Sequence, residues 1–406
     1  MNKQKKNAFW LILLFGLVSL FGDMVYEGAR SVNGPYLKTL GANAAIVGLV
    51  AGLGEFLGYA IRLASGYFAD RAKAYWLLTF LGYGMLISVP LLSLAGIWQV
   101  AVIFIILERL GKAIRSPARD TILSQATKQV GTGVGFAIAE VLDQIGAISG
   151  PLIFTMLFVS IGKGDRSLGD YQEGYSLLWV PLSLVLLCLF FAYRAVPDPE
   201  VLEDLTPKGP ESYKPSKIFW LYTVFTFITT LGFTNFALIG YHFKARHVLT
   251  DAQIPLFYAL AMGIDAIAAL VIGKVYDVFK ARRNNEKAGL IALIVIPVFS
   301  LFIPLFVFSM KFSFALIGAL IWGIVMGAHE TVMKSAIADL TPLKIRGTGY
   351  GIFNTAYGLA VFIGSAITGL IYDISISAVI TISVAVEIAA ILVFFTLKKM
   401  VLTARK

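Results

Sequence analysis

The sequence predicts an all-α membrane protein of twelve transmembrane helices arranged as two pseudo-symmetric six-helix halves. Hydrophobic residues make up 58% and charged residues only 14% of its 406 residues, whereas a soluble protein carries about 25% charged residues. Continuous apolar runs of about 20 residues, the length that crosses a hydrocarbon core, follow one another along the chain. Helices are expected because a bilayer satisfies backbone polar groups only within helices or closed barrels. Related glycine-containing motifs recur in both halves.

The apolar runs place each expected crossing. In the first half they predict spans at 8–30, 43–65, 75–97, 99–118, 132–160 and 174–194. In the second half they predict spans at 217–242, 252–275, 287–309, 312–338, 348–373 and 375–397. The polar stretch between the two sets contains several prolines, which prevent a continuous helix. We therefore expect an N-terminal half at 1–195, a flexible cytoplasmic linker at 196–216 and a C-terminal half at 217–406.

The net charge of +10 follows from topology. With the N-terminus in the cytoplasm, 25 of the 34 Lys and Arg residues lie on the cytoplasmic side and six lie in external loops. This asymmetry obeys the positive-inside rule and places both termini in the cytoplasm. We expect a multi-pass protein of the cell (inner or plasma) membrane, surrounded by lipid and without a nucleic-acid partner. The single cysteine, Cys188, excludes an internal disulfide.

Two pairs of similar motifs, with one member of each pair in each half, indicate an internal repeat. A Gly-Asp motif follows the second span at Gly66–Arg71, and a related one follows the eighth span at Gly273–Asp277. Gly-Thr-Gly segments precede the fifth span at Gly131 and the eleventh at Gly347. Because the two motifs occur in the same order in both halves, duplication explains them better than chance. Parallel six-helix repeats with a substrate site near the midplane are a common transporter plan.

These motifs resemble those of the major facilitator superfamily, and the resemblance covers essentially the whole chain. The hallmark loop of that family is present as Gly66, Asp70 and Arg71, although Ala72 replaces the usual glycine. In the family this loop gates the cytoplasmic side during alternating access. The resemblance therefore implies gating roles for these three residues and for Asp277 in the second half.

Further segments resemble exporters of the superfamily. Gly146, Gly150 and Pro151 form a Gly-x-x-x-Gly-Pro element similar to one in family antiporters, and we include all three among the gating residues. An ordinary small-residue packing face is the alternative interpretation. The segments Glu108–Asp120 and Gly327–Glu330 look like those of a prokaryotic subset that includes presumed drug and metal-ion exporters. The resemblance therefore implies export.

The first span carries three charged residues on one face. Asp23, Glu27 and Arg30 stand at positions i, i+4 and i+7, which align along a helix. A charge at the centre of a bilayer costs about 2.5–3.5 kcal/mol on insertion scales, so such residues usually have partners inside the protein. We expect this group to bind a proton or cation or to form an external gate. A salt bridge without a transport role is the alternative.

Charges in other spans suggest a proton-coupling network. Glu140 and Asp143 share a face near the middle of the fifth span. We expect Arg109 or Arg62 to neutralise one of three carboxylates, namely Glu55, Glu140 and Asp143. Protonation of that carboxylate would break the pair and let the halves rock. Static pairs between helices are the alternative interpretation.

The second half offers further candidates. Asp265 lies at a comparable depth on the eighth span, and Glu330 lies on the tenth. Asn235 and Asn354 are uncharged candidates for substrate contact, or else they form hydrogen bonds between helices. Glu387 belongs to the last span, which is usually peripheral in this family, so we do not count it among the transport residues.

Metal and nucleotide chemistry have weaker support. His242, His247 and His329 are the only histidines, and imidazole with carboxylate suits divalent cations. However, no His-x-x-x-His or His-rich tract occurs, so we assign no metal ligands. The sequence lacks a phosphate-binding Gly-x-x-x-x-Gly-Lys loop, and we expect no cofactor.

The sequence as a whole predicts a secondary transporter that works by alternating access as a monomer. We expect proton-coupled antiport that exports a small organic compound. Export of a divalent metal and uptake of a small metabolite by symport are the alternatives. A membrane-embedded enzyme or receptor is the alternative from another class, but no nucleophile or metal constellation supports an enzyme.

Overall fold

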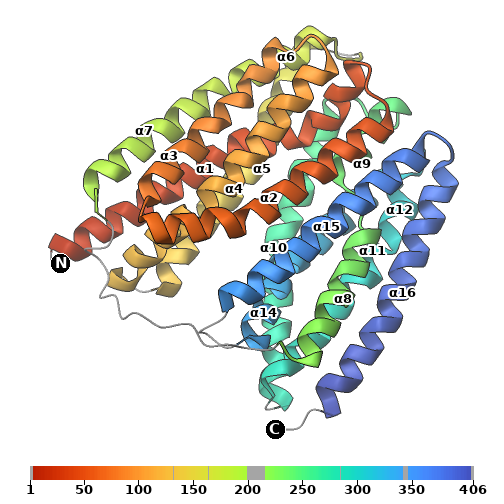
Figure 1. Cartoon of the computed structure of the whole chain (residues 1–406). Helices are drawn as coiled ribbons and strands as arrows, with labels where there is room; N and C mark the ends of the chain where they lie inside the picture. Colours follow the sequence, from red (N-terminus) through yellow and green to blue (C-terminus); the bar gives the residue numbers. More distant parts are fainter. Residues whose placement is uncertain are drawn as a thin grey trace. The chain divides into compact units, whose positions relative to one another are not determined.

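The computed structural model describes residues 3–130, 132–162, 164–198, 215–283, 285–341 and 346–403. Every regular element in these ranges is a helix (Figure 1), which confirms the all-α prediction. Within them, 11 helical segments are long and apolar enough to cross a membrane. The expected fourth crossing, α4 (Trp98–Val130), is not among these 11 segments. Three of its charged residues, Glu108, Arg109 and Arg115, are buried within the protein.

Three helices of the first half extend well beyond the predicted apolar spans. For example, α1 has 37 residues. Polar ends of these helices continue past the hydrocarbon core, so an apolar run marks only the central part of each one. Besides α4, the elements are α1 (Lys3–Thr39), α2 (Ala44–Ala72), α3 (Tyr75–Gly84), η1 (Met85–Ser88), η2 (Pro90–Leu94), α5 (Thr132–Ile161), α6 (Leu168–Leu177) and α7 (Trp179–Ala195).

In the second half, three crossings are not single α-helices. The seventh consists of α8 (Lys217–Gly232) and α9 (Phe236–Ala245), and the tenth consists of α13 (Phe312–Ala328), the π-helix η5 (His329–Met333) and α14 (Lys334–Leu340). The ninth consists of η4 (Glu286–Ile294), α11 (Val295–Ser300) and α12 (Phe302–Val307). The remaining elements are α10 (Gln253–Arg283), α15 (Arg346–Tyr372) and α16 (Ile376–Thr403).

The chain divides into two compact units. Unit 1 comprises Met1–Ala42, Leu57–Pro207 and Thr250–Ala259, and unit 2 comprises Asn43–Phe56, Lys208–Leu249 and Leu260–Lys406. Unit 1 therefore includes the first part of α10, and unit 2 includes the first part of α2. The remainder of each of these helices belongs to the other unit. Most of the expected linker and Gly131 lie outside the described residues.

In unit 1, glycines bring α1 and α5 into backbone contact. A Cβ atom at Gly146 would lie 3.0 Å from the Leu20 Cα, and one at Gly150 would lie 2.9 Å from the Met24 Cα. Real side chains do not approach a backbone that closely, so only glycine fits without a shift of the helices. Gly28 of α1 faces Gly150 in the same contact. The spacing of glycines on the fifth span thus has a packing role.

Unit 2 repeats this kind of contact between α8 and α15. A Cβ atom at Gly364 would lie 3.2 Å from the Leu231 Cα. The two Gly-Asp motifs also occupy corresponding places. Gly66 of α2 faces Pro117 of α4, and Gly273 of α10 faces Thr331 of the tenth crossing. The second helix of each half therefore packs on the fourth helix of that half at the motif glycine.

Candidate transport site

The α1–α5 contact brings two carboxyl groups together. Asp143 precedes Gly146 by three residues, slightly less than one helical turn, and Asp23 faces it from α1. The two carboxyl groups lie within hydrogen-bonding reach of each other, and Lys112 of α4 and Glu27 of α1 lie close enough to act electrostatically on Asp23. A hydrogen bond between two carboxyl groups requires a proton on one of them. The pair is therefore an arrangement that can hold one exchangeable proton.

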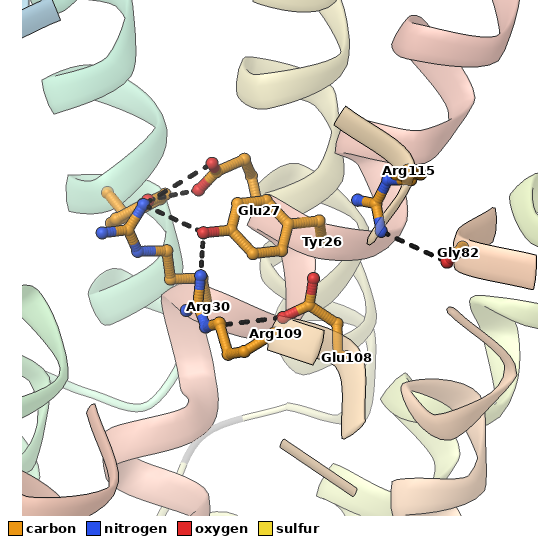
Figure 2. Close-up of polar contacts among 8 residues, drawn as sticks. Tyr26, Glu27, Arg30, Gly82, Glu108, Arg109 and Arg115 are labelled. Carbon is orange, nitrogen blue, oxygen red and sulfur yellow. Dashed lines mark hydrogen bonds and ion pairs between the residues drawn. The ribbon is translucent and has the colours of Figure 1, made fainter. Parts of the chain in front are cut away.

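Tyr26 is the centre of a cationic cluster beside this pair. Nη1 of Arg30 donates to the Tyr26 hydroxyl at 3.4 Å, and Nη1 of Arg109 donates to the same oxygen (Figure 2). Nζ of Lys112 lies 3.7 Å from the centroid of the Tyr26 ring, which is a cation–π contact. Because a hydroxyl oxygen has two lone pairs, the two guanidinium groups use its full accepting capacity.

Carboxylates neutralise the cations of this cluster. Oε1 of Glu27 lies 3.7 Å from Nη1 of Arg30, and Oε2 of Glu108 lies 3.4 Å from Nε of Arg109. Tyr258, from the part of α10 that belongs to unit 1, donates to Glu27. Glu27, Glu108 and Arg109 are only 6%, 4% and 6% exposed. Such burial in a membrane protein requires partners of opposite charge.

A small cavity adjoins the Tyr26–Arg109 contact and has room for about one water molecule. Within the described part of the chain, Oε1 of Glu108 is buried without a hydrogen-bond partner. Asn33 accepts a hydrogen bond from the hydroxyl of Tyr175 at 2.8 Å. The lining residues are Tyr26, Ala29, Asn33, Val89, Leu92, Ile105, Glu108 and Arg109.

The other predicted coupling residues have different surroundings. The ion pair found for Arg109 is with Glu108, a residue that the sequence analysis did not single out. Glu140 is exposed on α5, and Glu55 is half-buried in unit 2. The guanidinium of Arg62 lies 4.9 Å from the ring centroid of Tyr59.

In unit 2, the predicted residues have varied environments. Asp265 is fully buried, and a Cβ atom at Gly327 would lie 2.9 Å from its Oδ1. The Asn235 side chain caps α9 by accepting the N–H of Ala237 at 2.9 Å, so it fixes the interruption of the seventh crossing. Asn354 is half-buried on α15.

The gating candidates of unit 1 lie at the end of α2 and within α5. Nη1 of Arg71 donates to the hydroxyl of Tyr67 at 3.0 Å, and both side chains are exposed. The side chain of Asp70 lies outside the described residues. Pro151 is buried within α5, directly after Gly150.

In unit 2, the charged contact near the second Gly-Asp motif involves other residues. Asp277 is exposed. Nζ of Lys280 lies 2.9 Å from Oδ2 of Asp339, and the buried hydroxyl of Tyr276 donates to the same carboxylate at 2.7 Å. Asp339 of α14 thus joins the end of α10 to the tenth crossing.

The histidines are dispersed. His242 is buried with Nδ1 2.7 Å from the hydroxyl of Tyr372, His329 is buried beside Tyr357, and His247 is exposed. Among the residues that the structure describes, no three His, Cys, Asp or Glu side chains are grouped so that they could hold a metal ion.

Glu387, which the sequence analysis did not count among the transport residues, lies in the interior of unit 2. This residue is fully buried on α16, and its Oε2 accepts a hydrogen bond from the hydroxyl of Thr229 at 2.7 Å. A Cβ atom at Gly232, where α8 ends, would lie 2.7 Å from its Oε1. A carboxylate in the middle of an apolar span already signals an interior partner, and that signal was available in the sequence.

Comparison with known proteins decides the family. The sequence model of the Major Facilitator Superfamily matches residues 12–365. The chain belongs to this superfamily. It is 38% identical to an uncharacterised protein of Mycobacterium tuberculosis, over 97% of this chain and 94% of the relative. It is 28% identical to an uncharacterised MFS-type transporter of Methanocaldococcus jannaschii, over 92% of this chain and 91% of the relative.

Solved transporters share the fold. A peptide transporter POT has a TM-score of 0.74 at 14% identity, with 98% of each chain covered. The nucleoside transporter NupG has a TM-score of 0.73 at 12% identity, over 95% of this chain and 99% of that chain. At such low identity these likenesses show the fold alone. Together with the family, they confirm a multi-pass secondary transporter of small molecules, and members of this superfamily are carriers rather than enzymes.

Proposed function

We propose that this transporter is a proton-coupled antiporter of the cell membrane that exports a small organic compound as a monomer. The observation that carries this proposal is the close approach of the Asp23 and Asp143 carboxyl groups within the membrane-spanning part of unit 1. A carboxyl pair is suited to take up and release one proton, since loss of the proton converts attraction between the groups into repulsion.

The surroundings of the pair supply a response to that change. Lys112 acts electrostatically on Asp23 and also lies over the ring of Tyr26. When the pair loses its proton, its greater negative charge draws Lys112 away from the ring. Because Tyr26 also binds Arg30 and Arg109, this movement changes the whole cationic cluster. Proton release is thus linked to a rearrangement of α1 and α4.

Export is supported by the Gly146–Pro151 element, which resembles one in antiporters of the superfamily and which holds the carboxyl pair together. A divalent metal is the less favoured cargo. The described residues include no group of three His, Cys, Asp or Glu side chains that could hold a metal ion. Uptake by symport would use the same carboxyl pair, so only the measured direction of substrate movement separates it from export.

The test is transport in proteoliposomes that contain a pH-sensitive dye. Lipophilic cations, organic anions, sugars and divalent metals are applied in turn under an imposed pH gradient. We expect one organic class to trigger proton flux opposite to substrate movement. Asp23→Asn and Asp143→Asn should each lower this flux by about tenfold or more. Each variant leaves a single carboxyl group, which has no second carboxyl group with which to share the proton. Glu173→Gln, which alters an exposed carboxyl on α6, is the matched control.

Substrate movement that proceeds in both Asn variants with unchanged proton flux would overturn the coupling proposal. Proton flux in the same direction as substrate movement would replace antiport with symport. Flux triggered by divalent metals alone would replace the organic cargo.

A further inference from the structure

Two irregular helix segments of unit 2 meet through aromatic rings. The helical path is interrupted at Phe233–Asn235, between α8 and α9, and it widens to a π-helix at His329–Met333. The ring centroids of Phe233 and His329 lie 5.3 Å apart. Single π-helical turns occur frequently at functional sites, and interrupted transmembrane helices commonly border the substrate sites of transporters. The meeting point of the two segments therefore combines two features that are common at the ligand sites of transporters.

Within the described residues, one ring nitrogen of His329 has a hydrogen-bond partner and the other has none. Its Nδ1 lies 3.2 Å from the hydroxyl of Tyr357. The side chain is only 4% exposed, yet Nε2 has no hydrogen-bond partner within the described residues. Leaving a buried polar atom unpaired costs free energy. A ligand that pairs with Nε2 recovers that cost.

Two neighbouring side chains hold the irregular segments in place. Nε1 of Trp322 donates to the carbonyl of Thr234 at 3.0 Å, and the hydroxyl of Tyr222 donates to the carbonyl of Met333 at 2.9 Å. These two bonds satisfy backbone groups in the two irregular segments. Both segments are thus held in place, and Nε2 of His329 is left facing away from Tyr357.

Aromatic rings flank His329 on both sides. Phe233 stacks on Trp322 with centroids 5.8 Å apart, and Tyr357 stacks on Phe353 with centroids 6.1 Å apart. Trp322 and Phe353 are buried, whereas Phe233 and Tyr357 are half-buried. Each half-buried ring thus rests on a buried one and retains accessible surface. This is a rigid aromatic surface with one polar group, which is the usual composition of a small-molecule site.

We propose that Phe233, His329 and Tyr357 form a binding site for a planar aromatic ring of the substrate. A hydroxyl or ring nitrogen on that ring forms a hydrogen bond with Nε2 of His329. A phenolic hydroxyl suits either tautomer of the histidine, because it both donates and accepts. This inference gives the chemical class of the organic compound whose export is proposed above. It rests on the proposed function only for the transport of that compound, not for its binding.

The test is equilibrium binding to the purified full-length chain in lipid nanodiscs, with binding to empty nanodiscs subtracted. Three probes separate the two features of the site. Naphthalen-2-ol carries a planar ring and a hydroxyl, decahydronaphthalen-2-ol keeps the hydroxyl without planarity, and 2-methoxynaphthalene keeps the ring without a donor. We expect naphthalen-2-ol to bind about tenfold more tightly than its saturated counterpart, since two ring contacts are lost with planarity.

Variants then assign the contacts. Phe233→Leu should weaken naphthalen-2-ol binding by about tenfold, and His329→Phe should reduce it to the level of 2-methoxynaphthalene. Phe302→Leu, at an exposed phenylalanine of α12, is the matched control. Thermal unfolding verifies that each variant is folded. His329→Gln replaces His329→Phe if the latter does not fold, and it should lower naphthalen-2-ol binding because Gln removes the ring.

Equal binding of the planar and saturated alcohols would overturn the proposal, as would absence of saturable naphthalen-2-ol binding or unchanged binding in folded Phe233→Leu. These measurements use no proton gradient. Loss of coupling with retained naphthalen-2-ol binding therefore contradicts only the proposed function. Intact coupling without such binding contradicts only the aromatic site.

Discussion

In unit 1, α5 packs on α1 through Gly146, whose missing side chain makes room for the backbone at Leu20; in unit 2, α15 packs on α8 through Gly364 in the same way against Leu231. The side chains beside these contacts differ. Unit 1 carries a carboxyl pair and a cluster of buried and half-buried cations. Unit 2 carries stacked rings around His329.

The difference shows that backbone packing and interior chemistry are set separately. Glycines fix how closely two helices approach, and this constraint is similar in the two units. The remaining positions are free to carry charges in one unit and rings in the other. The helix paths differ accordingly. α1 runs without interruption from Lys3 to Thr39, whereas its counterpart in unit 2 is broken between Gly232 and Phe236.

The largest effect is expected from filling the glycine contacts. Gly146→Leu and Gly364→Leu should each destabilise the protein by about 1–3 kcal/mol or more, because the new side chain meets backbone. Gly146→Leu should also abolish coupled proton flux, since it separates Asp143 from α1. Thermal unfolding and flux measure the two effects. Gly58→Ala, at a glycine with open space around it, is the control. Normal coupling in Gly146→Leu would contradict the role of this contact.

A smaller effect is expected at the centre of the cationic cluster. Tyr26→Phe keeps the ring that Lys112 contacts but removes the hydroxyl that accepts from Arg30 and Arg109. Two charge-assisted hydrogen bonds are lost, so we expect a loss of about 1.5–3 kcal/mol in stability. Transport kinetics should show a lower maximal rate. An unchanged rate and melting temperature would show that the hydroxyl is dispensable.

Glu387 tests whether charge in unit 2 also serves coupling. Glu387→Gln keeps an acceptor for the hydroxyl of Thr229 and removes an ionisable group from the interior. We expect unchanged proton flux and a stability within about 1 kcal/mol of the parent. Glu387→Ala should instead destabilise the protein by about 2 kcal/mol, because it leaves a cavity. Loss of proton flux in Glu387→Gln would break the division between a charged unit 1 and an aromatic unit 2.

The smallest effect is expected at the Lys280–Asp339 ion pair. The side chains are 24% and 16% exposed, so solvent screens their attraction. Lys280→Met should cost about 1 kcal/mol or less. Titration of salt while thermal unfolding is followed should reduce the difference between parent and variant. A salt-independent loss of several kcal/mol would mean that the pair is more strongly isolated from water than its exposure indicates.

The sequence predicted the fold well because apolar length is a direct measure of membrane crossing. It also placed Glu27 and Arg30 on one face, and the structure joins them in an ion pair. The sequence could not predict the contact of Asp23 with Asp143, because helical periodicity relates only residues within one helix. Single-sequence reasoning has no information about which faces of two distant helices meet.

Other features had weak or ambiguous signals. Tyr26 is one of 17 tyrosines, and nothing in its local sequence distinguishes a residue that binds three cations from one that faces lipid. The π-helix at His329 also has no local sequence signature. By contrast, the break before α9 could have been predicted, since Gly232 followed by Asn235 within an apolar span combines a helix-ending residue with a helix-capping one.

The position of the Asp23–Asp143 pair has an electrical consequence. A proton that reaches the pair from one side of the membrane and leaves to the other crosses the full membrane potential, which is worth about 2.3 kcal/mol per 100 mV for one elementary charge. Exchange of one proton for a neutral compound therefore moves net charge and is driven by voltage as well as by the pH difference. Exchange of one proton for a monovalent cation moves no net charge, so only the concentration gradients drive it.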